Sequence, residues 1–247
     1  MGLVFLFLYA PIFVLIVFSF NAEKSRTVWH GFSLHWYAEL FQNERIMNAL
    51  YTTLLVSVLA AVIATIAGTA AAIGFYSMKR RPRTLLTSVS NITLTNAEII
   101  TGVSLMLLFV FLGKFLPFKL GFGTLLISHI TFDIPYVILS VMPKLRQLDP
   151  NIYEAAQDLG ASGLYAFRRV ILPEILPGVL NGMIIAFTMS FDDFIISYFT
   201  AGSSVSTLAM EIYSMTRKRI SPEINALSTL LFVVVLALLL IVNLRQS

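Results

Sequence analysis

Acidic side chains stand inside otherwise apolar stretches of this 247-residue chain. Glu98, Asp133, Asp192 and Asp193 belong to runs that contain no lysine or arginine. An ionised carboxylate in the hydrocarbon core of a bilayer is costly, so it usually faces a cavity, a partner or a cation. Four acids without internal bases suit the passage of a positively charged substrate. A helix cap, a bond to a neighbouring hydroxyl, or a protonated carboxyl would be the structural alternatives.

Helical spacing places three of these acids in polar stripes. Ser190, Asp193 and Ser197 form one stripe on the stretch 175–200. Two further stripes follow the same spacing: Asn91, Thr95, Glu98 and Gly102 on the stretch 85–112, and Asn181, Thr188 and Asp192 on the stretch 175–200. At 1.5 Å per residue, Asp192 and Glu98 lie roughly 25 Å and 22 Å from the cytoplasmic ends of their stretches. We therefore expect the two acids at similar depth, in the outer half of the membrane.

Two other side chains could take part in binding. Trp36 would ordinarily anchor the chain at the membrane–water interface. The more specific interpretation is that its ring forms an aromatic surface for an alkyl-ammonium chain. His129 has no partner at metal-ligand spacing apart from Asp133, so we expect a polar packing residue and no metal site. The candidate substrate path therefore consists of Asp192, Asp193, Glu98, Ser190, Trp36 and Asp133.

Composition requires a lipid environment around these residues. Hydrophobic residues make up 57% of the chain and charged residues 12%, with a mean hydropathy of +0.84. Soluble domains carry about twice that share of charge. The chain has no cysteine, which excludes disulfides and cysteine-ligated metals. The basic residues lie in short loops between apolar runs, where they mark topology and give no reason to expect nucleic acid binding.

Six stretches are long enough to cross the bilayer, since about 20 apolar residues suffice. They are 1–20, 50–76, 85–112, 120–142, 175–200 and 225–244. The first lacks a basic leader and a cleavage site, so we expect a retained helix. The sequence thus predicts an all-α fold with six membrane helices, in a single domain over 1–247. Basic residues are divided almost evenly between the two sets of loops, so charge alone does not orient the chain.

A ridge of small residues runs along the second span. Ala60, Ala64, Gly68 and Ala72 recur every four residues. Such a ridge lets another helix approach closely in lipid. We expect packing within this chain.

The connection 143–174 is amphipathic and contains helix signals. Asp149 followed by Pro150 predicts a helix start, and Gly160 suits the left-handed residue that ends a helix. Ser162 is placed to cap a second short helix, which Pro173 should end. The two helices would leave a small apolar face uncovered.

The same connection resembles the EAA loop of ABC-importer permeases. Glu154, Ala155 and Ala156 are followed by Gly160 and then by Val-Ile-Leu-Pro, ending at Leu172 and Pro173. Val170 in place of isoleucine is the only departure from the family pattern. The resemblance implies a permease of the type I fold and a coupling helix that docks on an ATPase subunit. It also implies a cytoplasmic loop, and hence cytoplasmic N- and C-termini.

Further pieces resemble the spermidine/putrescine permease subunits. They are Tyr9-Ala-Pro-Ile, Trp36-Tyr37, His129-Ile-Thr-Phe, Asp158-Leu-Gly-Ala-Ser, Ser190-Phe-Asp-Asp and Ser221-Pro-Glu-Ile-Asn-Ala-Leu. This likeness implies a bacterial inner-membrane importer with a second homologous permease, two ATPase subunits and a periplasmic polyamine-binding protein. Those relatives often have proline where Ala97 stands, so a helix break before Glu98 does not carry over.

Several catalytic signatures are missing from the sequence. It contains no G-x-x-x-x-G-K-[ST], no H-E-x-x-H and no G-x-S-x-G. We therefore expect a transport subunit that is not an enzyme and has no cofactor, with ATP and magnesium bound by partner ATPase subunits. The alternatives are an EAA-type permease for another cargo such as ferric iron, and an ion-coupled secondary transporter that uses the buried acids.

Overall fold

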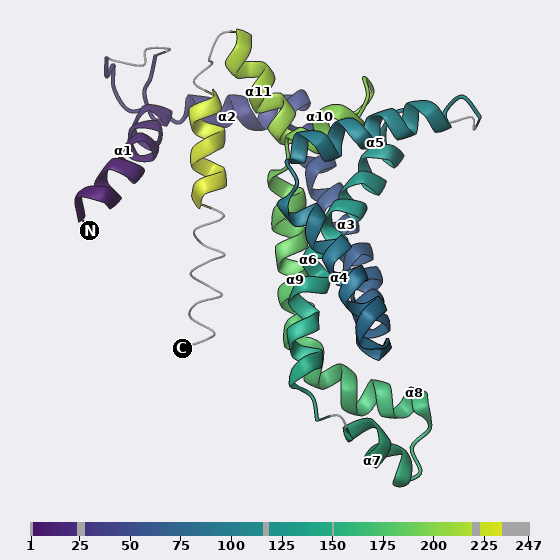
Figure 1. Cartoon of the computed structure of the whole chain (residues 1–247). Coiled ribbons are helices and arrows are strands. Elements are labelled where there is room, and N and C mark those ends of the chain that lie inside the picture. The colour runs from purple at the N-terminus through teal and green to yellow at the C-terminus, as the bar shows by residue number, and fades with distance from the viewer. Residues whose placement is uncertain (1, 24–27, 116–118, 150, 219–222, 234–247) are drawn as a thin grey trace. The chain divides into compact units, whose positions relative to one another are not determined.

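The computed structural model describes residues 2–23, 28–115, 119–149, 151–218 and 223–233. The described residues are helical apart from loops and one isolated bridge between Asn21 and Phe32, which confirms the predicted all-α class (Figure 1). They form two compact units. The first unit comprises Met1–Leu50 and Leu208–Ser247, and the second comprises Tyr51–Thr207.

Four described helical stretches are long and apolar enough to span a membrane. They are α1 (Gly2–Ser19), α3 (Glu44–Ser77), α6 (Phe122–Gln147) and the continuous stretch Gly163–Asp192. The bent pair α4 (Arg80–Thr95) and α5 (Glu98–Leu112) would make a fifth. Of the expected span 225–244, the structure describes the short apolar helix Glu223–Val233, and the remainder lies outside the described residues.

The first unit joins both ends of the chain. It contains α1, α2 (His35–Gln42), the first turns of α3, α11 (Leu208–Lys218) and the helix Glu223–Val233. Its core consists of Leu40, Ile46, Leu208 and Leu227. Arg45 at the start of α3 forms an ion pair of 2.7 Å with the buried Glu211 of α11. Trp36 is also buried, and its indole N–H donates a 2.6 Å hydrogen bond to the Asn21 carbonyl.

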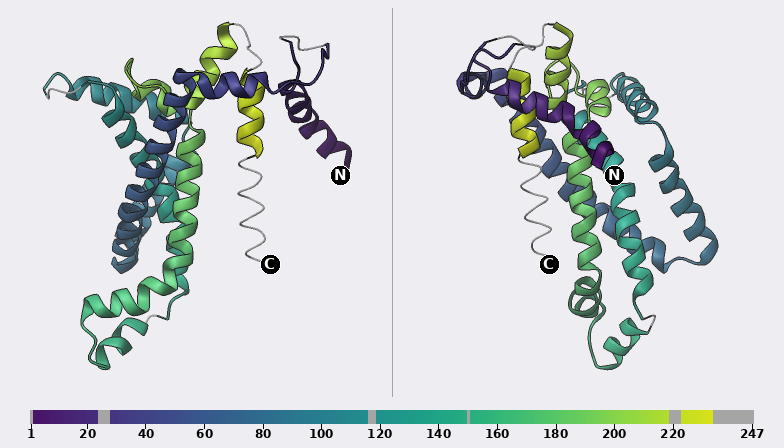
Figure 2. Two further views of the ribbon diagram at one scale, coloured as in Figure 1. Left: turned by 180° about the vertical axis from the view of Figure 1, so that it is seen from behind. Right: turned by 90° about the vertical axis from the view of Figure 1, so that its left-hand side faces the viewer.

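The second unit is built around α6 and α9 (Leu172–Asp192), which run side by side in all views (Figures 1 and 2). Glycines allow the close approach: a Cβ atom at Gly178 would come within 3.0 Å of the Ser140 carbonyl, and one at Gly182 within 3.3 Å of Val137 Cα. Gly178 and Gly182 form a G-x-x-x-G pair, which favours tight helix pairing in lipid.

The predicted small-residue ridge packs within the chain. Ala60, Ala64, Gly68 and Ala72 are all buried. A Cβ atom at Gly68 would lie 2.7 Å from the Val137 Cβ on α6. The expectation of intramolecular packing is therefore confirmed at α3 and α6.

The third predicted span is not one helix. It is divided into α4 and α5, which meet at a bend of 105°, and Asn96 and Ala97 between them are extended. The break therefore occurs without proline. Thr95 and Asn96 are poor helix formers, and Glu98 suits the first turn of a new helix because of its charge. The stripe predicted through Asn91, Thr95, Glu98 and Gly102 is wrong, because the bend separates its two halves.

The fifth predicted span is also divided. The helix ends at Asp192, Asp193 is extended with ψ 125°, and α10 (Ile195–Thr200) begins after Phe194. The stripe predicted through Ser190, Asp193 and Ser197 is therefore wrong as a helical face. Tertiary contacts bring these three residues together instead, as described below.

The connection 143–174 forms α7 (Ile152–Asp158), α8 (Gly163–Ala166) and the π-helical segment η1 (Phe167–Ile171), which continues into α9. The helix start is two residues later than predicted: Asn151 is the N-cap, and the Asp149 carboxylate accepts a hydrogen bond from its N–H. Pro150 lies outside the described residues. Gly160 has φ +86°, which confirms the predicted left-handed residue.

Pro173 does not end the second helix of this connection, contrary to the prediction. The helical stretch continues from Gly163 to Asp192. In η1 the Leu172 N–H bonds to the Phe167 carbonyl, five residues earlier. Proline has no N–H to donate to a carbonyl in the preceding turn. The wider turn of η1 accommodates this missing donor, and Pro173 occupies the first turn of α9.

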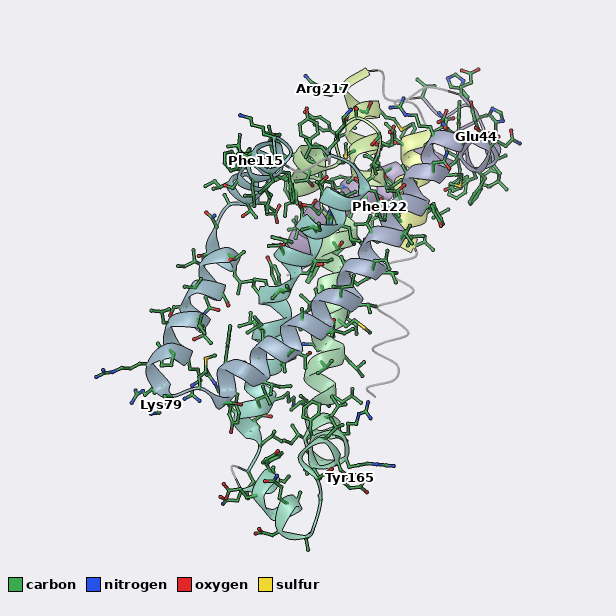
Figure 3. The ribbon with its side chains drawn as sticks, turned by 90° about the vertical axis from the view of Figure 1, so that its right-hand side faces the viewer. Glu44, Lys79, Phe115, Phe122, Tyr165 and Arg217 are labelled. Carbon is green, nitrogen blue, oxygen red and sulfur yellow. The ribbon has the colours of Figure 1, made fainter. Side chains whose placement is uncertain are left out.

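The connection between the second and third predicted stretches, residues 77–84 by sequence, is shorter in the structure. α4 begins at Arg80, so the connection from α3 consists of Met78 and Lys79 only. Pro82 falls in the first helical turn, where its missing N–H has no helical partner to lose. In Figure 3, Lys79 and Tyr165 of α8 lie toward one end of the second unit, and Phe115 and Phe122 lie toward the other.

Candidate functional site

Two helix breaks meet in the second unit, and each carries acids. Glu98 opens α5 directly after the first break, and Asp192 closes α9 directly before the second. α5 packs on α10 through Gly102, where a Cβ atom would lie 3.1 Å from the Phe199 ring and 3.5 Å from the Ile195 carbonyl. Through this contact, Glu98 interacts electrostatically with both Asp192 and Asp193.

Asp193 is buried and stabilises the start of α10. Its Oδ1 accepts a hydrogen bond from the Ile196 N–H at 3.1 Å, and its Oδ2 accepts one from the Ser197 N–H at 2.8 Å. The first N–H groups of a helix have no partner within the helix, so a carboxylate there satisfies them and interacts well with the helix dipole. The charge of Asp193 therefore stabilises α10 as a helix separate from α9.

His129 links the break to α6. Its Nδ1 lies 2.6 Å from Ser190 Oγ, and its Nε2 lies 3.0 Å from Ser197 Oγ and 3.6 Å from Asp193 Oδ2. All four side chains are buried. These bonds confirm the expectation that His129 is a polar packing residue. Its partners could not be predicted from neighbours in sequence, because they lie 61 and 68 residues further along the chain.

The four acids differ sharply in exposure. Glu98 and Asp192 are exposed in this chain, whereas Asp133 is fully buried. Neither carboxylate oxygen of Asp133 has a hydrogen-bond partner among the residues that the structure describes. Asp133 interacts electrostatically with Asp193, so all four acids belong to one neighbourhood.

Tyr136 is a further member of this neighbourhood that sequence analysis did not select. It is half-buried on α6, interacts electrostatically with Glu98 and Asp133, and packs edge-on against Phe132. An aromatic ring beside carboxylates is a suitable surface for an alkyl-ammonium group. Its spacing of three residues from Asp133 was the available signal.

Two expected path residues have other contacts in this chain. The hydroxyl of Ser190 is buried and bonded to His129. Trp36 belongs to the first unit, where its ring is buried and its N–H is bonded to the Asn21 carbonyl. We therefore build the proposal below on Glu98, Asp192 and Asp193.

The connection between α6 and α9 presents apolar side chains at the other end of the unit. Leu159, Leu164 and Tyr165 are exposed, and Leu159 reaches 90% exposure. A depression of about 530 Å³ is lined by Ala156, Leu159, Gly160 and Tyr165, together with Ala161, Ser162 and Val170. Of the EAA residues, Glu154, Ala155 and Pro173 are exposed, whereas Leu172 packs against the core of α6 and α9.

The fold and a family model identify the class of protein. The chain matches the model for the binding-protein-dependent transport system inner membrane component over residues 64–246, and it therefore belongs to this family. Its fold is similar to a bacterial ABC transporter that imports the acidic polysaccharide alginate, with a TM-score of 0.72 at 11% identity, covering 100% of this chain and 92% of that one. An amino acid ABC transporter structure gives a TM-score of 0.58 at 20% identity, covering 86% and 98%.

Two curated relatives are similar over most of their length. The spermidine/putrescine transport system permease protein PotC of Escherichia coli K12 is 37% identical over 240 residues, which is 97% of this chain and 89% of the relative. The putrescine transport system permease protein PotI of the same organism is 40% identical over 230 residues, or 92% and 82%.

Family membership settles the kind of subunit. The chain is a multi-pass inner-membrane permease component of an ABC importer, a non-catalytic subunit of a family that carries no cofactor. A binding-protein-dependent system implies ATPase and binding-protein partners. The alternative of an ion-coupled secondary transporter is therefore wrong.

Proposed function

We propose that this permease forms half of the translocation path of a polyamine importer and that spermidine or putrescine is the cargo. Glu98, Asp192 and Asp193 carry the proposal, because two helix breaks gather them in spans that contain no lysine or arginine. Ammonium groups match such a site in charge. The cargo named for both curated relatives supports the same class.

The proposed assembly contains a second homologous permease, two ATPase subunits and a periplasmic polyamine-binding protein. The connection 143–174 would dock on one ATPase through its exposed apolar side chains. The residues assigned to this coupling are Glu154, Ala155, Ala156, Gly160, Leu172 and Pro173.

We assign the end of the second unit that carries α7 to the cytoplasm, with both termini on that side. The EAA connection carries this orientation, since basic residues are divided almost evenly over the whole chain; within the second unit alone they agree with it. Near the end marked by Lys79 and Tyr165 in Figure 3 lie Lys79, Arg80, Arg81, Arg83, Lys144, Arg146, Arg168 and Arg169. The opposite end of the unit, beyond α5, carries Lys114 and Lys119. Positively charged residues accumulate on the cytoplasmic side of membrane proteins.

The proposed path is tested by Asp192→Asn, which keeps the size of the side chain and removes its charge. Uptake of spermidine and putrescine per assembled complex should fall about ten- to a hundredfold, which corresponds to about 1.4 to 2.8 kcal/mol. The experiment uses proteoliposomes with the complete complex and loaded binding protein. Ferric iron serves as the competing cargo.

Glu44→Gln is the matched control, because it neutralises an exposed acid in the first turn of α3 that belongs neither to the path nor to the coupling connection. It should transport at close to the parental rate. Parental uptake by both Asp192→Asn and Asp193→Asn would refute the cation path, and uptake of ferric iron alone would refute the polyamine cargo.

A further inference from the structure

The imidazole of His129 bonds to both sides of the break between α9 and α10. Ser190, on its Nδ1 side, lies in the last turn of α9, and Ser197, on its Nε2 side, lies in the first turn of α10. A second bond ties α10 to α6 at its far end, where the Thr124 hydroxyl donates to the Thr200 carbonyl at 2.8 Å. α6 therefore contacts the α9–α10 elbow, defined here as Ser190 to Thr200, at three points.

The hydrogen bonds of His129 have a defined direction. The Asp193 carboxylate, which accepts two backbone N–H bonds, also lies 3.6 Å from Nε2. A negative charge beside Nε2 favours the tautomer with its proton on that nitrogen, so Nε2–H donates to the Ser197 hydroxyl. In a neutral imidazole the other nitrogen is then an acceptor, so the Ser190 hydroxyl donates to Nδ1. The hydrogen bonds thus run from Ser190 through His129 to Ser197, beside the carboxylate of Asp193.

We propose that His129 is a positioning residue for transport: it fixes the α9–α10 elbow and thereby the direction in which Asp192 and Asp193 present their charges. This inference rests on the proposed cation path. Asp192 is the last residue of α9 and adjoins the break, so the backbone held by Asp193 sets its place. A displacement of about 1 Å in a positioned group can cost a hundredfold in rate.

Three replacements of His129 separate its two bonds from its volume. His129→Gln can place an amide nitrogen near the position of Nε2 and so keep the donor to Ser197. His129→Asn can reach only the Nδ1 position, toward Ser190. His129→Phe fills a similar volume without either bond. Because the Nε2 side is the one that faces Asp193, we expect His129→Gln to keep uptake within about threefold of the parent and His129→Phe to lose about tenfold, with His129→Asn close to His129→Phe.

The decisive measurement is a double-mutant cycle on uptake per assembled complex, with His129→Phe, Asp193→Asn and the double variant. A residue that acts through Asp193 has no further effect once that carboxylate is gone, so the double variant should lie within about twofold of the worse single variant. A purely structural histidine would give losses that multiply. If His129→Phe does not assemble, Ser197→Ala takes its place in the cycle.

The outcomes keep this inference apart from the proposed path. Multiplying losses, or a His129→Gln variant no better than His129→Phe, would overturn the positioning role. Parental uptake by His129→Phe would also overturn it, even where Asp192→Asn loses uptake and the cation path stands. Parental uptake by both aspartate variants would remove the path itself, whatever His129 does.

Discussion

The two ends of the second unit are built in opposite ways. At one end, the connection 143–174 is held by bonds between near neighbours, such as that from the Ala161 N–H to the Ala156 carbonyl, and it exposes Leu159 and Leu164. At the other end, the α9–α10 elbow contains the buried polar chain of His129, with partners on other helices. One end has an uncovered apolar surface, and the other has a buried hydrogen-bond network that joins three helices.

Substitutions at the two ends should therefore have different consequences. Apolar surface is unfavourable in water. On a subunit with ATPase partners, we therefore expect an exposed apolar surface to be buried in the complex. Changes there should affect the partner while the chain itself folds. A buried network of hydrogen bonds is costly to leave half-made, so changes around α6 should affect the fold of the permease. The following predictions test this separation.

The largest effect is expected from Gly160→Asp in the coupling connection. Its φ of +86° is strained for any side chain, at a cost of about 1–2 kcal/mol, and the added carboxylate would face the docked partner. We expect a normal amount of assembled complex and a loss of at least tenfold in cargo-stimulated ATPase activity. The structure leaves open space around this position within the chain itself, so no internal clash interferes with folding.

Gly160→Ala is the control that isolates the backbone strain from the charge. It should retain a measurable part of the ATPase stimulation. Full stimulation in the Gly160→Asp complex would contradict the coupling role of the connection, and loss of the permease from the membrane would contradict its independence from the fold.

An intermediate effect is expected from Gly68→Ala in α3. The new Cβ would lie 2.7 Å from the Val137 Cβ and 3.2 Å from the Ile134 carbonyl on α6, so the two helices must separate. Overpacking of this kind costs about 1–3 kcal/mol. The melting temperature and the yield of the detergent-solubilised complex should fall, while the surviving complex couples ATP hydrolysis to transport normally.

Gly74→Ala is the matched control in the same helix, since nothing lies within 4 Å of the Cβ that it would add. It should be neutral or slightly stabilising, because alanine favours helix over glycine. Equal melting temperatures and yields for the two variants would mean that the contact between α3 and α6 does not limit stability. Impaired coupling of ATP hydrolysis to transport in Gly68→Ala would contradict the proposed difference between the two ends.

Features that depend on neighbours in sequence could be predicted. The left-handed Gly160 and the small-residue ridge of α3 follow from residue types at fixed spacing. The continuation of the helix through Pro173 could not be predicted in the same way. It depends on the wider turn of η1, and no signal in the sequence separates such a turn from a break.

Features that depend on distant contacts were missed. The stretch 175–200 contains no proline after Pro177 and no glycine after Gly182, so nothing local marks the end of α9 at Asp192. The break is stabilised by Asp193, which accepts hydrogen bonds from the Ile196 and Ser197 N–H groups, and by His129, which bonds to the Ser190 and Ser197 hydroxyls. The four acids could be chosen as candidates because they lie in apolar stretches. Which of them are exposed and which are buried depends on packing against α6, and the sequence does not reveal it.

The smallest effect is expected from Asp133→Asn, although this acid is the most deeply buried of the four. Both of its carboxylate oxygens lack partners among the described residues, so its burial brings a desolvation cost without a compensating bond. Replacing the carboxylate by a neutral amide of the same shape reduces that cost. We therefore expect an equal or greater amount of assembled complex and uptake per complex within about twofold of the parent, measured beside Asp192→Asn in one set of proteoliposomes. The contrast follows from exposure: a cargo cation can meet the exposed Asp192 in this chain, whereas the protein itself encloses Asp133. A loss at Asp133→Asn as large as that at Asp192→Asn would show that the buried acid meets the cargo. The end of the unit that contains the His129 network would then have to open during each transport cycle.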